Sequence, residues 1–156
     1  MLVEPEIPPN TGNIARLCAA TRSPLHLVEP LGFSIDAHAV RRAGLDYWHL
    51  VEVTTHSTYA AARHAIDERG EAARHWLFTG KAQRSYLDVE FRPGDALVFG
   101  KESVGLPAAL LDAHATELVG IPTLGAVRSL NLANAVAIAL YEALRQTGEL
   151  DAARLE

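Results

Sequence analysis

The polar residues best suited to chemistry stand at the start of the last long apolar segment, IPTLGAVRSLNLANAVAIALYEALRQ, which covers Ile121–Gln146. Ser129 is a good N-cap for a helix expected from Asn131 to Thr147. Asn131 and Asn134 are three residues apart and share a helix face near its amino end. Free N–H groups and the helix dipole favour an anionic or electron-rich ligand there. The alternative is that both amides only cap the helix or bridge neighbouring loops.

The same helix is apolar all round from Ala135 to Tyr141. A helix without a polar face is normally buried on more than one side. In a chain of this length a partner subunit can cover the second side, so we expect a homodimer with this helix at the interface. Gly148 is placed to end the helix in a left-handed cap.

Short apolar runs alternate with helical patterns along the rest of the chain, which predicts an α/β fold with a mostly parallel sheet and helices on both faces. The expected strands are Met1–Glu4, Leu25–Val28, Leu50–Val53, Trp76–Phe78, Ala96–Phe99 and Leu118–Ile121. The expected helices before the last are Asn13–Ala20, Asp36–Arg42, Ser57–Arg69 and Pro107–His114. The first strand is unusually short because Pro5 follows it.

Ligands of such sheets bind beyond the carboxyl ends of the strands. The loops expected there are Pro5–Asn13, Thr79–Ser85, Gly100–Pro107 and Pro122–Asn131. None carries a G-x-G-x-x-G motif, and the segment from Gly100 departs from a P-loop because Glu102 stands where Ser or Thr is needed. These departures argue against a Rossmann cofactor or ATP.

The bulk composition predicts one domain over residues 1–156, large enough to bury a core. The single cysteine, Cys18, excludes an internal disulfide, and no Cys and His spacing predicts a structural metal. We see no signal peptide and no apolar run of the ~20 residues that a membrane span needs, so we expect a soluble cytoplasmic protein. The net charge is −5, with only two lysines, so any contact with RNA must be local.

Three motifs, in this order and spacing, resemble those of the SPOUT, or trefoil-knot, RNA methyltransferases. They are EPEIPPNTGNIARLCAAT from Glu4, FGKESVGLP from Phe99 and the segment from Ile121 described above. Within that family, the chain is most similar to the small tRNA 2′-O-methyltransferases that modify the wobble nucleotide. Leu27–Phe33 and Arg41–Trp48 also resemble this subgroup.

The resemblance implies a C-terminal trefoil knot, a homodimer whose active site the partner completes, tRNA as substrate, and S-adenosylmethionine as methyl donor without a metal. By position, the cofactor contacts would be Phe78, Gly100, Ile121, Ser129, Leu130 and Asn134. The residues expected to contact RNA are Asn10, Asn13, Lys101 and Tyr141, and Arg16 matches the motif arginine at the target ribose. Without the resemblance, Phe78 and Ile121 would be interpreted as core, Gly100 as a turn residue and Arg16 as a solvated helix residue.

The chemistry of methyl transfer fits these residue types. Glycine-containing loops let the backbone approach adenine, and we expect a larger residue at Gly100 to block the cofactor while the fold stays intact. Arg16 cannot act as a literal base because a guanidinium stays protonated, so we expect it to orient the target phosphate and favour a developing 2′-oxyanion. Glu102 is expected to hold its loop by accepting backbone N–H bonds, and the proton acceptor stays unassigned.

Two alternatives remain open at this point. One is 2′-O-methylation of another RNA such as ribosomal RNA, although such relatives usually carry an extra RNA-binding domain. The other is a non-catalytic RNA-binding module on the same fold, against which Arg16, Ser129 and Asn134 argue. In the second motif the subgroup usually has arginine at Val104 and proline at Lys101, so one RNA-facing charge has moved by three positions.

Overall fold

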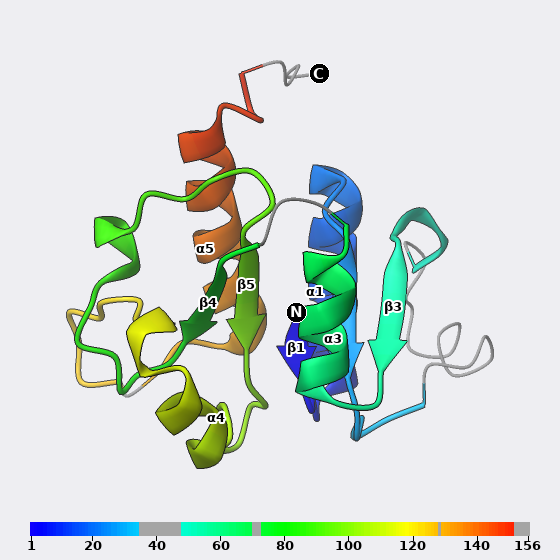
Figure 1. Ribbon diagram of the computed structural model, residues 1–156, viewed down its shortest axis with the longest axis horizontal. Helices are drawn as coiled ribbons and strands as arrows, with labels where there is room; N and C mark the ends of the chain where they lie inside the picture. The colour runs from blue at the N-terminus through cyan, green and yellow to red at the C-terminus, as the bar shows by residue number, and fades with distance from the viewer. Residues whose placement is uncertain (35–47, 70–72, 128, 152–156) are drawn as a thin grey trace.

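The computed structural model describes residues 1–34, 48–69, 73–127 and 129–151, and in these ranges the chain forms a six-stranded parallel sheet with helices on both faces (Figure 1). The strands are β1 Leu2–Val3, β2 Leu25–Val28, β3 Val53–His56, β4 His75–Phe78, β5 Ala96–Phe99 and β6 Leu118–Val119. The helices are α1 Pro8–Thr21, α3 Tyr59–Asp67, α4 Ala108–Ala113 and α5 Leu132–Thr147, with short 3₁₀ turns at Trp48–Leu50, Tyr86–Asp88 and Ala115–Glu117. The α/β fold with a parallel sheet is confirmed.

The spatial order of the strands is β3-β2-β1-β5-β4-β6, which puts the very short β1 at the centre of the sheet. Leu2 pairs with Leu27 on one side and with Phe99 on the other. The N-terminal ammonium of Met1 donates a hydrogen bond of 2.8 Å to the carbonyl oxygen of Leu97. Burial lowers the pKa of this amine to about 6. Backbone pairing on both sides therefore holds a strand that is too short to be stable by itself.

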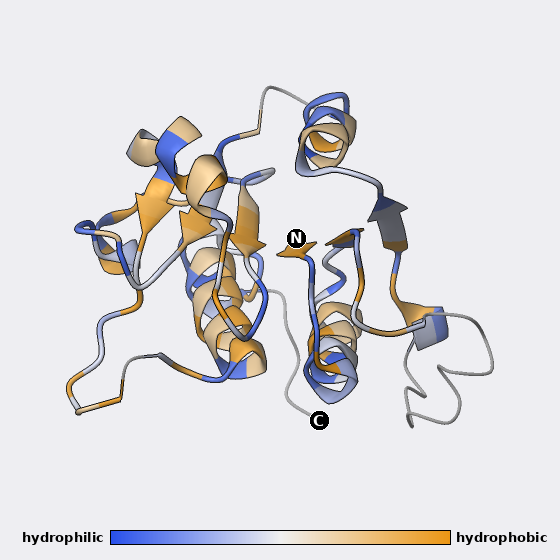
Figure 2. Ribbon diagram, turned by 90° about the horizontal axis from the view of Figure 1, so that it is seen from below, coloured by the Kyte–Doolittle hydropathy of each residue, from blue (hydrophilic) through white to orange (hydrophobic). Residues whose placement is uncertain are grey.

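Alternate residues of each strand face two separate cores, as the period of two requires. Leu2, Phe78 and Phe99 belong to the core under α1 and α5, whereas Val3 and Val98 belong to the core under α3 and α4. Figure 2 shows the mainly hydrophobic strands as the middle layer between these two pairs of helices. Cys18 is buried on the α1 side.

Several boundaries differ from the expected ones for local reasons. Helix α1 begins at Pro8 rather than Asn13, because two prolines occupy its first turn, where no N–H donor is needed. Strand β3 starts where the apolar run that we expected at Leu50–Val53 ends, since a polar segment, Val53–His56, makes the pairs with β2. Thr58 caps α3 by accepting from the N–H of Ala61. The helix expected at Asp36–Arg42 lies outside the described residues.

At the end of the chain, α5 confirms the expected C-cap but not the expected N-cap. Gly148 has φ +75° and closes the helix by donating to Leu144 and Arg145 carbonyl groups. The N-cap is Asn131, not Ser129, because the carboxamide oxygen of Asn131 accepts from the N–H groups of Ala133 and Asn134. None of the helices in the described part of the chain is long and apolar enough to cross a membrane.

A buried histidine pair joins β2 to β3. Nδ1 of His26 lies 2.9 Å from Nε2 of His56, and their rings stack with centroids 5.1 Å apart. A bond between two ring nitrogens needs one donor and one acceptor, which suits two neutral imidazoles. Burial, the Met1 ammonium, His56 and Arg69 together lower the pKa of His26 to about 4, against a smaller opposing effect of Glu52.

This pair predicts a loss of stability in mild acid. The unfolded chain binds a proton at His26 near pH 6.5, whereas the folded chain binds it only near pH 4, so the free energy of unfolding falls as pH drops through that window. We expect His26 to account for about 3 kcal/mol of that fall. Urea unfolding between pH 7.5 and 4 should show this loss in the parent and a smaller loss in His26→Gln. Equal losses in the two proteins would contradict the assignment, and the exposed His49→Gln is the control.

Candidate functional site

The loops that leave the carboxyl ends of the strands meet at one edge of the sheet, as the sequence predicts. The segment after β1 leads into α1, the one after β5 leads towards α4, and the one after β6 leads into α5 (Figure 1). Each of these loops contains one of the three motifs. The parallel order of the strands therefore brings the first motif, which begins at Glu4, next to the motifs that begin at Phe99 and Ile121.

Glu102, in the loop after β5, holds the start of α1. Its two carboxylate oxygens accept hydrogen bonds from the N–H of Glu6 at 2.8 Å, the N–H of Ile7 at 3.3 Å and Nδ2 of Asn10 at 3.0 Å. Helix α1 has no side-chain cap of its own and no acidic residue in its first turn. Glu102 supplies the missing negative charge from another loop. The expectation that it accepts backbone N–H bonds is confirmed, but the N–H groups belong to the first motif rather than to its own loop.

Asn10 and Asn131 extend this contact to the third motif. Nδ2 of Asn131 donates to Oδ1 of Asn10 at 3.0 Å, while Oδ1 of Asn131 accepts from the N–H of Ala133 at 2.9 Å and of Asn134 at 3.3 Å. Asn10 is only 8% exposed, so its amide is committed to Glu102 and Asn131. We name Glu102, Asn10 and Asn131 the amide bridge, because they connect all three motifs in one line of hydrogen bonds.

The sequence pattern alone does not identify Asn131 as a site residue. It predicts this amide at the helix start, capping the helix or bridging loops, and the structure shows both capping and bridging. Asn134, on the same face, is exposed, and its side chain remains available to a ligand. The signal that identifies Asn131 is the N-cap position itself, for which Ser129 is the wrong residue.

Charged side chains reinforce the junction of the first two motifs. Nζ of Lys101 donates to Oε2 of Glu4 at 2.7 Å, and the N–H of Ser103 donates to Oε2 of Glu6 at 3.0 Å. These bonds raise the pKa of Lys101 and lower that of Glu6. The carboxylate of Glu4 thus compensates part of the positive charge of Lys101. The contact of Lys101 with RNA stays a prediction.

Gly100 is required by the fold of its own loop. A Cβ atom built there would lie 2.1 Å from the carbonyl carbon of Gly105 and 2.2 Å from the backbone nitrogen of Leu106. No rotation of a side chain relieves such a contact, because backbone atoms make it. The expectation that a larger residue would leave the fold intact is therefore wrong, and a substitution at Gly100 cannot test cofactor binding alone.

The other expected cofactor residues differ in accessibility. Phe78 is 8% exposed and stacks on Phe99, with ring centroids 4.5 Å apart, as a core residue would. Ile121 and Leu130 are half-buried, and Ser129 is exposed. Residues 122–127 between them are exposed. This loop therefore combines half-buried apolar side chains with exposed chain, which suits a nucleoside with a flexible polar tail.

Arg16, Asn13 and Tyr141 lie on helix surfaces. Asn13 and Arg16 are three residues apart on one exposed side of α1, and Tyr141 on α5 is 47% exposed. The structure thus brings Asn10 and Glu102 together and leaves these three facing outward. Among the described residues, no group of three or more His, Cys, Asp or Glu side chains could hold a metal ion.

Comparisons with known proteins agree with this arrangement. Residues 1–141 match the model of the SpoU rRNA Methylase family. A tRNA (cytidine(34)-2'-O)-methyltransferase of Burkholderia pseudomallei is 48% identical over 149 residues, which cover 95% of this chain and 94% of the relative. A solved structure described as "Structural insights into the 2-OH methylation of C/U34 on tRNA" is 48% identical with a TM-score of 0.83, covering 93% of this chain and 92% of its own. An AdoMet-bound rRNA methyltransferase from Sinorhizobium meliloti is 27% identical with a TM-score of 0.76, and the match covers 92% of this chain but 54% of its own.

Proposed function

This chain belongs to the SpoU rRNA methylase family, and from that premise we propose that it transfers a methyl group from S-adenosylmethionine to the 2′-hydroxyl of the wobble nucleotide, position 34, of tRNA. The observation that carries the proposal is the 48% identity with a tRNA (cytidine(34)-2'-O)-methyltransferase over nearly the whole length of both chains. The enzyme would work in the cytoplasm, where tRNA is modified.

Sequence similarity favours tRNA over ribosomal RNA as the substrate. The chain is 48% identical to the tRNA-modifying relative over 94% of that relative, but 27% identical to the Sinorhizobium rRNA methyltransferase. A non-catalytic module is disfavoured because the amide bridge is complete and Arg16, Ser129 and Asn134 are all present.

The cofactor would lie at the loop 121–130 and the amino end of α5. Ile121 and Leu130 offer half-buried apolar surface, and Ser129 and Asn134 offer exposed polar side chains. When bound, S-adenosylmethionine supplies an activated methyl group on a sulfonium. Phe78 would support this pocket from the core, through its stacking on Phe99, and Gly100 would support it by letting its loop close on Gly105.

The residues of the first motif would hold the target ribose. In-line displacement needs the 2′-oxygen at about 3 Å from the carbon that it attacks, so the main task of the protein is positioning. Arg16 would orient the target phosphate and stabilise the developing 2′-oxyanion, with Asn13 on the same side of α1. The amide bridge fixes the start of α1 relative to α5 and so sets the distance between the ribose side and the cofactor side.

We propose further that the active protein is a homodimer with a C-terminal knot. Ile138 and Tyr141 on α5 are 40% and 47% exposed, although α5 is apolar around them, and a second copy would cover this face. The knot is supported by two backbone hydrogen bonds of Gly120: its N–H donates to the carbonyl oxygen of Arg84, and its carbonyl oxygen accepts from the N–H of Tyr86. The loop after β4 therefore contacts the chain on both sides of Gly120, just before the chain continues to α5.

If α5 forms the dimer interface, a charged residue placed on its exposed apolar face should change the oligomeric state. Ile138→Arg should shift the protein from dimer to monomer, or to aggregate, because a buried charge without a partner costs several kcal/mol. Light scattering at micromolar concentration measures this. Leu87→Arg, at an exposed apolar residue on the 3₁₀ turn Tyr86–Asp88, is the control. A parent that is monomeric at that concentration would remove the proposal.

The substrate is tested by incubating the protein with labelled S-adenosylmethionine and, separately, total tRNA and ribosomal RNA. We expect label in tRNA only. Label in ribosomal RNA alone would favour the alternative substrate, and label in neither, with cofactor binding intact, would favour the non-catalytic module.

A further inference from the structure

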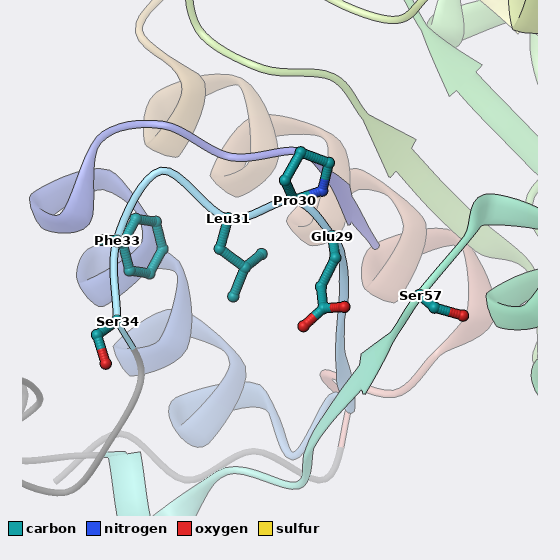
Figure 3. Close-up of a pocket in the computed structure, with 6 residues that line it drawn as sticks. All are labelled: Glu29, Pro30, Leu31, Phe33, Ser34 and Ser57. Atoms are coloured by element: carbon teal, nitrogen blue, oxygen red, sulfur yellow. The ribbon is translucent and has the colours of Figure 1, made fainter.

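An open pocket of about 600 Å³ lies beside the proposed active site, at the carboxyl ends of β2 and β3. Glu29, Pro30, Leu31, Phe33, Ser34 and Ser57 line it. Figure 3 shows that the segment from Glu29 to Ser34 curves around the pocket beside α1, with Leu31 and Phe33 on its inner side, and that Ser57 lies at the end of β3 with its hydroxyl pointing away from that segment. Nothing in the proposed mechanism uses this pocket.

The pocket is attached directly to the loop that the amide bridge holds. The N–H of Gly32 donates to the carbonyl oxygen of Pro5 at 2.9 Å. A Cβ atom at Gly32 would lie 2.8 Å from Cα of Glu6, so the two backbones touch and only glycine permits it. Glu6 in turn donates its N–H to Glu102. The wall of the pocket and the start of α1 are therefore one connected unit.

The order of the strands places the pocket next to the target ribose along the sheet edge. The loops proposed to hold the cofactor follow β5, β4 and β6, α1 with Arg16 follows β1, and the pocket follows β2 and β3. Neighbouring strands are about 4.8 Å apart, so the pocket lies roughly one or two strand spacings beyond the start of α1. An RNA strand whose target nucleotide lies at α1 would reach it with a neighbouring nucleotide.

The lining suits a base rather than a phosphate. Leu31 and the ring of Phe33 are half-buried and offer apolar surface for stacking. Among the lining residues that the structure describes, none is a lysine or an arginine, and the exposed carboxylate of Glu29 repels phosphate. A carboxylate is an acceptor only, so it bonds to the exocyclic amino group of a base.

Building on the proposed function, we propose that this pocket receives an unpaired base that flanks the methylated nucleotide. The ring of Phe33 stacks on the base, and the carboxylate of Glu29 accepts a hydrogen bond from its amino group. Bases with an exocyclic amino group are preferred over uracil at that position. By binding the flanking base, the loop Glu29–Ser34 positions the RNA strand so that the target ribose lies at Arg16.

The test uses anticodon hairpins in which each base next to the target is replaced in turn by 2-aminopurine or by an abasic nucleotide. With the parent protein, 2-aminopurine at one flanking position should be quenched on binding, and the abasic hairpin should lose roughly ten- to a hundredfold in kcat/KM. Phe33→Ala should remove both effects, so that intact and abasic hairpins react alike. Phe33→Tyr should restore them, because it keeps the ring.

Two controls separate the possible failures. Phe33 belongs to neither core that the described residues form, so Phe33→Ala should keep its thermal unfolding temperature, and Leu87→Ala is the matched exposed apolar change. Glu29→Gln should reduce the preference for an amino-bearing base without changing cofactor affinity. Quenching without methylation would refute the proposed function but not the pocket. Methylation with equal sensitivity to the abasic change in parent and Phe33→Ala would overturn the pocket and leave the function standing.

Discussion

Replacing Arg16 by alanine is expected to slow methyl transfer at least about a hundredfold while S-adenosylmethionine binds nearly as tightly as before. The physical reason is that a preorganised contact to developing charge contributes typically about 2.7–4 kcal/mol, and it acts only when the ribose oxygen becomes negative. Arg16 is exposed on α1 and is not among the residues proposed to hold the cofactor, so binding and chemistry should separate.

Single-turnover rates on saturating tRNA and calorimetry with the cofactor measure the two effects. Arg16→Lys should restore little, because a point charge cannot reproduce the planar fork of a guanidinium on a phosphate or ribose edge. Arg92→Ala, at an exposed arginine before β5, controls for the loss of one surface charge. If Arg16→Ala keeps most of the parent rate, Arg16 is an ordinary helix arginine.

Glu102→Gln is expected to have the largest effect on both stability and activity together. The carboxylate accepts three hydrogen bonds, and an amide in its place turns an NH₂ group towards the donors of Glu6, Ile7 or Asn10. Hydrogen bonds to charged groups contribute about 1.5–3 kcal/mol each, so we expect a loss of about 3 kcal/mol in the free energy of unfolding. Turnover should fall with it, because the start of α1 is then no longer fixed.

Urea unfolding and tRNA methylation measure this pair of effects, with Glu90→Gln, at an exposed glutamate, as the control. Combining Glu102→Gln with Asn10→Ala should cost less than the sum of the single changes, because the two side chains share a bond. Strict additivity, or a Glu102→Gln protein as stable and active as Glu90→Gln, would show that the amide bridge does not hold the site.

Local sequence signals predicted the elements well where one residue decides the outcome. Gly148 ends α5 as expected, and Ala96–Phe99 is a strand with the expected bounds. The predicted bounds of a strand were wrong where a residue far away in the chain determines the pairing. Strand β3 pairs through Val53–His56, because His56 finds a buried partner in His26 on β2, which local hydrophobicity cannot show.

At the site, too, local sequence signals predicted some features, whereas contacts between distant residues decided others. The motifs indicated which loops meet, but not how they are joined, since Asn10 and Asn131 are 121 residues apart in the chain. The need for glycine at position 100 also comes from a backbone approach by Gly105, which residue types alone do not reveal. For Phe78, its place in the core and a supporting role at the cofactor pocket are compatible, and its contact with the cofactor stays a prediction.

The most direct test of the central proposal is to map the methyl group in tRNA after incubation with the protein and S-adenosylmethionine. Nuclease digestion and mass spectrometry of the product identify both the nucleotide and the methylated atom. The proposal predicts a single new 2′-O-methyl group, on the ribose at position 34. A methyl group on a base, or on the ribose of any other nucleotide, would contradict it.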